Sequence, residues 1–179
     1  MSLLFRLLRI LFASLFRKKV TSILEPTELM MRVWPTDLDL NIHLNNGRYL
    51  TIMDVGRIDL IMKVGAFGAL IKGGIRPVVG SAQIQYRKPL GPLKRFRLVT
   101  EVVGWDEKWF YLRQQFHRLD GTLCADAYVR TLFLGPSGRL TSEQILALLP
   151  TEIPSSPSFE DCIPLLAPST SPKSIAQEE

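Results

Sequence analysis

Cysteine is scarce in this 179-residue chain. The two cysteines, Cys124 and Cys162, have neither the spacing of metal ligands nor the density of a disulfide-rich secreted scaffold. The chain also lacks internal repeats, a glycine-rich phosphate loop and a dinucleotide-binding unit. These absences argue against a metal-binding or disulfide-rich secreted protein, a repeat protein and a nucleotide-binding enzyme. They favour one ordinary globular domain with free thiols in a reducing compartment.

An excess of one charge is confined to the start of the chain. The formal net charge is +5, from 22 basic and 17 acidic side chains, but five of the basic ones precede the first acidic residue, Glu25. The remainder is electroneutral and lacks the basic face that a phosphate-backbone binder needs. We therefore expect no nucleic-acid partner.

Long uninterrupted apolar runs are missing as well. Arg6 and Arg9 leave only Ile10 to Phe16 free of charge, which is too short for a membrane-spanning helix of about 20 residues. The strongest basic cluster follows this apolar part, whereas a signal peptide has its charge first. Leucines at helical spacing predict a basic amphipathic helix in residues 1–24. Met1 to Lys19 either contacts a membrane surface or packs on the domain or a partner subunit.

Residues 25–149 predict a single α+β domain. Apolar side chains at helical spacing on more than one face predict a helix from about Asn46 to Val64 that is buried nearly all round, with Gly65 as its stop. A short strand from Leu29 to Trp34 comes before this helix. A short helix from Thr141 to Leu149 closes the domain.

Four long antiparallel strands are predicted after the central helix, because apolar and polar residues alternate there with a period of two. An Asp-Gly pair at Asp120 and Gly121 predicts a hairpin, and meander connections are the simplest topology. A sheet of about five strands would then wrap the helix. The tail, residues 150–179, is rich in proline and serine and is not expected to continue the sheet.

The most unusual stretch is "TDLDLNIHLNNGRYL", from Thr36 to Leu50, which places several polar side chains immediately before the central helix. Asn45 or Asn46 can cap the helix, because a side-chain oxygen there satisfies backbone N–H groups that have no intrahelical partner. A cap does not account for the rest of the cluster, which consists of Asp37, Asp39, Asn41 and His43.

The cluster has the parts that thioester hydrolysis requires. A helix N-terminus offers N–H groups and a positive dipole end that stabilise a developing oxyanion. A carboxylate held beside it can attack an acyl carbon or activate water.

This order of residues resembles the loop of hotdog-fold acyl-CoA thioesterases of the 4-hydroxybenzoyl-CoA thioesterase type. Further motifs between about Leu29 and Leu134 resemble the subgroup of proteins similar to thioesterase superfamily member six; these motifs are Arg48-Tyr49-Leu50, Asp54-x-x-Arg57, Gly80-Ser81, Tyr86-Arg87-Lys88-Pro89-Leu90 and Gly104 to Tyr111. The resemblance implies a hotdog fold, a long central helix wrapped by a curved antiparallel sheet. It also implies a homodimer or homotetramer with sites between paired subunits.

The resemblance assigns the catalytic carboxylate to Asp39 and the amide that polarises the thioester carbonyl to the region of Asn46. A structural role in an Asx-type turn is the alternative for Asp39. Ile42 occupies a position that is often glycine in related loops, so the geometry of the acyl site depends on it. His43 is expected to hold the loop by hydrogen bonds rather than act as a base, and Asp37 is expected to be structural.

The substrate-binding candidates are His43, Asn45 and Tyr49 near the helix start, and Arg87 and Lys88, which could meet coenzyme A phosphates or serve only to keep a strand edge soluble. Tyr49 could equally be a core residue. Asp54 is a lesser catalytic candidate, because its spacing to Arg57 suits an i,i+3 ion pair.

The sequence therefore predicts an acyl-CoA thioesterase that requires no metal or redox cofactor, located in the cytoplasm or peripherally at a membrane. One alternative is a non-catalytic acyl- or lipid-binding hotdog protein held at a membrane surface. Another is hydration of enoyl thioesters in the same fold, which would require His43 as a base.

Overall fold

The computed structural model describes residue 12 and residues 20–150 and 153–157. Most of the predicted N-terminal helix and most of the predicted tail lie outside these residues; the last residues of that predicted helix, 20–24, are described and are not helical. The elements in chain order are β1 (Thr27–Arg32), the 3-10 helix η1 (Pro35–Asp37), α2 (Asn46–Lys63), α3 (Phe67–Lys72), β2 (Arg76–Tyr86), β3 (Arg95–Trp105), β4 (Phe110–Arg118), β5 (Leu123–Gly135), β6 (Gly138–Leu140) and α4 (Ser142–Leu146).

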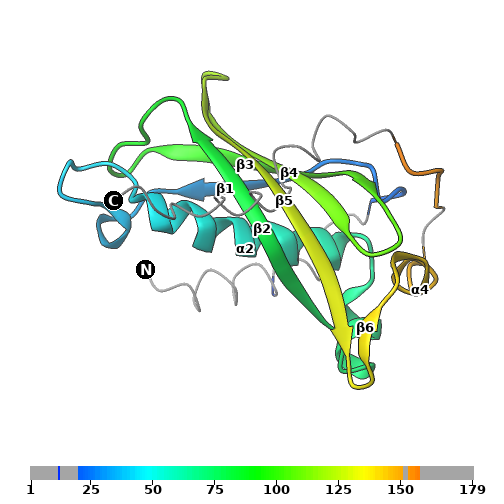
Figure 1. The fold of residues 1–179 in the computed structure, drawn as a ribbon. Coiled ribbons are helices and arrows are strands. Elements are labelled where there is room, and N and C mark those ends of the chain that lie inside the picture. The colour runs from blue at the N-terminus through cyan, green and yellow to red at the C-terminus, as the bar shows by residue number, and fades with distance from the viewer. Residues whose placement is uncertain (1–11, 13–19, 151–152, 158–179) are drawn as a thin grey trace, which may run out of the picture.

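The sheet curves over the long helix α2, as Figure 1 shows. Its strand order is β1-β3-β4-β5-β2, all neighbours are antiparallel, and β6 extends the sheet beside β5. The α+β prediction is confirmed. The meander prediction is right for β3, β4 and β5 but wrong for β2, which pairs with β5 instead of β3 because β1 and β4 occupy both sides of β3.

The helix α2 begins and ends as its sequence predicts. The Asn45 side chain caps the first turn, and Gly65 follows the last turn with a φ of 79°, a left-handed conformation that glycine adopts at little cost. After the first turn, only Leu50 and Asp54 are exposed. The remaining side chains pack between the sheet and neighbouring segments, so the helix is buried over most of its surface.

Two clusters of buried apolar side chains lie along α2. The first surrounds its N-terminal half and includes Tyr49, Ile52 and Met53 with inward-facing residues of β1, β3, β4 and β5. The second surrounds its C-terminal half and adds residues of α3 and α4. The two halves of the helix therefore pack against different clusters. The polar loop precedes the N-terminal half, which packs in the first cluster.

Trp109, in the connection between β3 and β4, packs on β2. The register between β2 and β5 shifts around Gly80, and a Cβ atom added there would collide with the ring of Trp109. Only glycine leaves room for this ring, which accounts for the Gly80-Ser81 motif in packing terms.

Candidate functional site

The loop before α2 is fixed by hydrogen bonds on both sides. Asp37 is 2% exposed, and its Oδ2 atom accepts a hydrogen bond from the Trp34 N–H at 2.9 Å. Its carbonyl oxygen accepts from the Asn45 N–H, also at 2.9 Å. The structure therefore gives Asp37 the structural position expected of it.

Asp39 lies at the turn of the loop. Its Oδ1 atom accepts hydrogen bonds from the N–H groups of Asn41 at 2.9 Å and His43 at 3.2 Å. This is the Asx-type arrangement expected as one alternative. Its Oδ2 atom makes no hydrogen bond to any residue that the structure describes. One oxygen of this half-buried carboxylate thus holds the loop, and the other is available to a ligand.

Ile42 has a φ of 59°, in the left-handed region, and its side chain is 62% exposed. A β-branched residue pays a steric cost in this conformation, whereas glycine does not. The tight loop demands this backbone, because the Ile42 N–H donates to the Asp39 carbonyl at 3.1 Å. The structure therefore explains why glycine suits this position.

His43 contributes to the loop through its backbone. Its N–H reaches Asp39 Oδ1, and its carbonyl oxygen accepts from the Asp39 N–H at 2.9 Å. The imidazole is exposed and makes no hydrogen bond within the described part of the chain. The expected loop-holding role is thus carried by backbone atoms rather than by the ring.

The start of α2 presents a free donor. Asn45 Oδ1 accepts from the Gly47 N–H at 2.9 Å, so Asn45, not Asn46, is the cap residue. The Asn46 N–H has no acceptor among the described residues. Such an N–H at the positive end of a helix dipole is suited to stabilising an oxyanion.

The end of β2 meets the start of α2. The Tyr86 hydroxyl donates to the Asn46 carbonyl at 3.2 Å, and burial raises the pKa of Tyr86. Arg87 and Lys88 follow directly, both exposed, with their N–H groups bonded to the Cys124 carbonyl at 2.8 and 3.1 Å. These two cations therefore follow directly on Tyr86, whose hydroxyl reaches the start of α2 from 40 residues further along the chain.

Tyr49 lies in the core. It is 3% exposed and packs edge-on against Tyr86 and Phe116, with ring centroids 5.1 and 4.8 Å apart. Burial raises its pKa. The structure therefore supports a role for Tyr49 as a core residue. Its ring is covered by other aromatic side chains rather than presented to a substrate.

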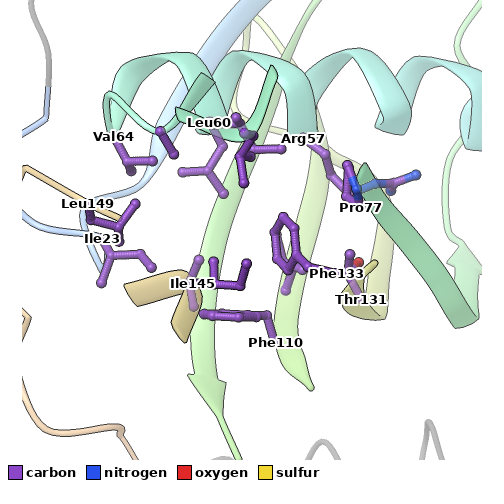
Figure 2. A pocket seen from close by; sticks show the side chains of 15 residues that line it. Ile23, Arg57, Leu60, Val64, Pro77, Phe110, Thr131, Phe133, Ile145 and Leu149 are labelled. Carbon is purple, nitrogen blue, oxygen red and sulfur yellow. The ribbon is translucent and has the colours of Figure 1, made fainter. Parts of the chain in front are cut away.

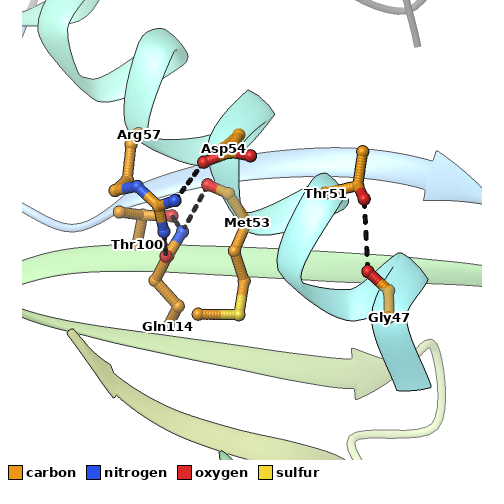
Figure 3. Close-up of polar contacts among 7 residues, drawn as sticks. All are labelled: Gly47, Thr51, Met53, Asp54, Arg57, Thr100 and Gln114. Atoms are coloured by element: carbon orange, nitrogen blue, oxygen red, sulfur yellow. Dashed lines mark hydrogen bonds and ion pairs between the residues drawn. The ribbon is translucent and has the colours of Figure 1, made fainter. Parts of the chain in front are cut away.

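A polar network crosses the middle of α2 (Figure 3). Arg57 pairs with Asp54 as the spacing predicts, and its Nη1 atom donates to Gln114 Oε1 at 2.7 Å. Gln114, fully buried, donates through Nε2 to the Met53 carbonyl and to Thr100 Oγ1, both at 3.0 Å. Burial lowers the pKa of Arg57.

Neither Gln114 nor the glycine that accommodates it, Gly56, was predicted from the sequence. A Cβ at Gly56 would lie 2.7 Å from Leu98 Cδ2 and from Thr100 Oγ1, and 2.9 Å from Gln114 Nε2. One signal was present in the sequence: Gln114 interrupts the alternation of Leu112 and Phe116 at an inward-facing position of β4.

Within the described residues, no group of three or more His, Cys, Asp or Glu side chains is arranged to hold a metal ion. No helix of the described part is long and apolar enough to cross a membrane.

A family model described as the thioesterase-like superfamily matches residues 33–163. The chain belongs to this superfamily. Protein THEM6 of Danio rerio is 36% identical over 111 residues, which cover 62% of this chain and 55% of that protein. Protein THEM6 of Drosophila melanogaster is 28% identical over 116 residues, which cover 64% of this chain and 57% of that protein. The chain thus spans about half the length of the curated relatives it matches.

Solved structures of thioesterases have a similar fold. The DHNA-CoA thioesterase of Staphylococcus aureus is 16% identical with a TM-score of 0.61, covering 66% of this chain and 82% of that one. The BH1999 gentisyl-coenzyme A thioesterase is 18% identical with a TM-score of 0.62, covering 68% of this chain and 99% of that one. The hotdog fold and the member-six-like relationship predicted from the sequence are confirmed.

Proposed function

We propose that this protein hydrolyses acyl-CoA thioesters, with Asp39 as the catalytic carboxylate. The observation that carries the proposal is that the two oxygens of the Asp39 carboxylate differ in their hydrogen bonding. Oδ1 is held by two backbone N–H groups, and among the described residues neither Oδ2 nor the N–H of Asn46, to which the loop leads, has a hydrogen-bond partner. The names of the similar structures, a gentisyl-CoA and a DHNA-CoA thioesterase, agree with this class of substrate.

In the proposed reaction, the Asn46 N–H donates to the thioester carbonyl oxygen and stabilises the oxyanion of the tetrahedral intermediate. Asp39 either attacks the carbonyl carbon or takes a proton from the water that does so. The C–S bond then breaks, and the thiolate leaves and is protonated. If water attacked, the acyl group is released directly as the carboxylate; if Asp39 attacked, a second step, in which water hydrolyses the mixed anhydride, releases the carboxylate and regenerates Asp39. Asp39 needs no exceptional basicity if it acts as the nucleophile.

Four other side chains are proposed to contact substrate. Arg87 and Lys88 would bind the phosphates of coenzyme A, because both are exposed next to the start of α2. The exposed His43 ring and the Asn45 side chain, which lie between Asp39 and Asn46 in the chain, are the other two. Tyr49 would act only indirectly, because its ring packs against Tyr86 and Phe116 and so supports the first turn of α2.

A second copy of the chain is proposed to pair along β2. This strand is 11 residues long and forms an edge of the described sheet. Its helix-facing side carries Pro77, Val79 and Tyr86, all exposed, which is unusual for apolar residues beside a core. Antiparallel pairing with a second β2 would cover this apolar strip and satisfy the open backbone groups. A homodimer, or a homotetramer built from it, would follow.

We also propose a cytoplasmic location with peripheral membrane contact through Met1 to Lys19. Flotation with anionic liposomes tests this proposal. The full chain should float, and a chain lacking residues 1–19 should not; equal flotation of both would contradict it.

A panel of acyl-CoAs from acetyl to long-chain and aromatic, followed by release of free thiol, tests the proposed activity. We expect hydrolysis of at least one class at rates well above the spontaneous reaction. No hydrolysis across the panel, combined with saturable binding of an acyl-CoA, would instead identify a non-catalytic acyl-binding protein.

A further inference from the structure

An apolar cavity of about 60 Å³ lies beside the C-terminal half of α2, at the opposite end of the helix from the Asp39 loop (Figure 2). This volume is several times the ~10–15 Å³ that one water molecule requires. Leu60 and Val64 of α2 form one wall, and Phe110 and Phe133 of the sheet form another. Ile145 of α4 helps to close the cavity. No residue of the Asp39 loop is among the described residues that line it.

Of the described residues that line the cavity, only Arg57 and Thr131 are polar. Thr131 is 3% exposed, and its Oγ1 atom is buried without a hydrogen-bond partner among the described residues. A buried hydroxyl with no partner costs free energy, whereas valine would fill the same place in a strand without that cost. The hydroxyl is explained if a ligand supplies the missing partner.

Arg57 determines the charge that such a ligand can carry. Its side chain is 12% exposed, and its guanidinium already pairs with the Asp54 carboxylate and donates to Gln114. The positive charge is therefore compensated before a ligand arrives. A carboxylate entering the cavity would be desolvated without a free cation to pair with, so the lining favours a neutral oxygen.

Pro77, one of the lining residues, is exposed on the edge strand β2, so the cavity extends to the edge along which pairing is proposed. If two copies pair antiparallel along β2, the N-terminal half of one strand lies opposite the C-terminal half of the other. That half ends at Tyr86, which contacts Asn46 at the start of α2. An acyl chain held at the loop of one copy would thus point toward the cavity of the other.

We propose that this cavity binds the end of an aliphatic chain that carries a neutral oxygen, a hydroxyl or a carbonyl, with the Thr131 hydroxyl as its hydrogen-bond partner. The connection of this chain to a thioester rests on the proposed function; the chemistry of the cavity does not. The preferred substrates would be acyl-CoAs with an oxygenated chain end.

Methyl NMR spectra of the full chain test the site directly, with 2-pentanol and pentane as probes. We expect 2-pentanol to shift the methyl signals of Leu60, Val102 and Ile145, and to leave those of Leu29 and Leu98, in the other cluster, unchanged. Absence of shifts in the first set at saturating 2-pentanol would overturn the proposal.

Thr131→Val tests the role of the hydroxyl. We expect affinity for 2-pentanol to fall about five- to tenfold, affinity for pentane to be unchanged, and the Tm of the free protein to rise, because an unpaired hydroxyl is removed. Thr27→Val is the matched control: Thr27 is equally buried, but its hydroxyl donates to the Thr100 carbonyl at 3.3 Å. It should lower the Tm and leave both affinities unchanged. Equal 2-pentanol affinity in wild type and Thr131→Val would contradict the proposal.

Hydrolysis assays separate this inference from the proposed function. Thr131→Val should raise KM about five- to tenfold for an acyl-CoA with a hydroxyl near the chain end, and not for the unsubstituted acyl-CoA of the same length. Retained 2-pentanol binding without any hydrolysis would refute the thioesterase proposal alone. Hydrolysis without 2-pentanol binding would refute the cavity proposal alone.

Discussion

The Tyr86 hydroxyl donates a hydrogen bond to the Asn46 carbonyl at 3.2 Å, which joins the last residue of β2 to the first residue of α2. Arg87 and Lys88 follow Tyr86 directly in the chain, so this contact holds their backbone near the helix N-terminus. Their backbone N–H groups are bonded to the Cys124 carbonyl, so their position is set by the sheet. This relationship gives the coenzyme A assignment a geometric basis that the sequence alone did not provide.

Replacement of both Arg87 and Lys88 by alanine should raise KM for acyl-CoA about three- to tenfold with little change in kcat, because each exposed charge contributes modestly. The N-acetylcysteamine thioester of the same acyl group lacks the coenzyme A phosphates and should be hydrolysed as before. Steady-state kinetics with both substrates measure the difference. Alanine at Arg97, on β3 and away from the β2 edge along which pairing is proposed, is the control and should affect neither. Equal effects of the Arg87 and Lys88 changes on both thioesters would rule out phosphate binding.

Ile42→Gly should stabilise the protein by about 1 kcal/mol, because the left-handed backbone at this position disfavours a side chain with a Cβ. Ile42→Val keeps the branched Cβ and serves as the control, with little change expected. The free energy of unfolding in urea gives the comparison. A loss of stability in Ile42→Gly would show that the exposed side chain contributes contacts that outweigh its backbone strain.

Local features of the fold could be predicted from the sequence. The cap at Asn45, the stop at Gly65 and the hairpin at Asp120 and Gly121 each depend on residues next to one another in the chain, and the structure has all three. The loop residue Asp37 was also placed correctly. In each case, the chemistry of a few neighbouring side chains determines the backbone.

Long-range features could not be predicted in the same way. A period of two shows that β2 is a strand but not which strand it pairs with. Its pairing with β5 follows from the whole sheet closing over α2. The role of Gln114 likewise requires knowing that Gly56 and Arg57 lie opposite it. The cavity beside Thr131 is formed by segments from across the chain, so no single motif reveals it.

Gly56→Ala should destabilise the protein by about 1–3 kcal/mol, because the new methyl group would lie within 2.7–2.9 Å of three atoms of β3 and β4. Gly68→Ala in α3 is the matched control. A Cβ there meets nothing within 4 Å, so this change should stabilise by roughly 0.5–1 kcal/mol. Chemical unfolding of both variants tests the pair. Similar effects at the two glycines would contradict the close packing of α2 on the sheet.

Tyr111 should make stability depend on alkaline pH. Burial, together with a 2.7 Å hydrogen bond donated to Asp106 Oδ2, raises its pKa to about 12 from an ordinary value of 10. The folded protein therefore holds this proton more tightly than the unfolded chain does. The stabilisation is complete below pH 10 and is lost as the pH rises to 12.

Tyr111→Phe should be less stable than wild type at pH 8, and its stability should decline less steeply between pH 10 and 12. Unfolding free energies at several pH values provide the measurement. Tyr49 and Tyr86, whose pKa values are also raised, remain in both proteins and serve as a common background. Identical slopes for the two proteins would exclude the Tyr111 assignment.

The central claim is that the Asp39 carboxylate performs the chemistry, and Asp39→Asn tests it most directly. Asparagine keeps an Oδ1 acceptor for the N–H groups of Asn41 and His43, so the loop and the Tm should be preserved. We predict that kcat for acyl-CoA hydrolysis falls about 10²- to 10⁴-fold with KM little changed. Asp54→Asn, on the exposed side of α2, should stay within a few-fold of wild type. Wild-type kcat in a folded Asp39→Asn protein would contradict the account.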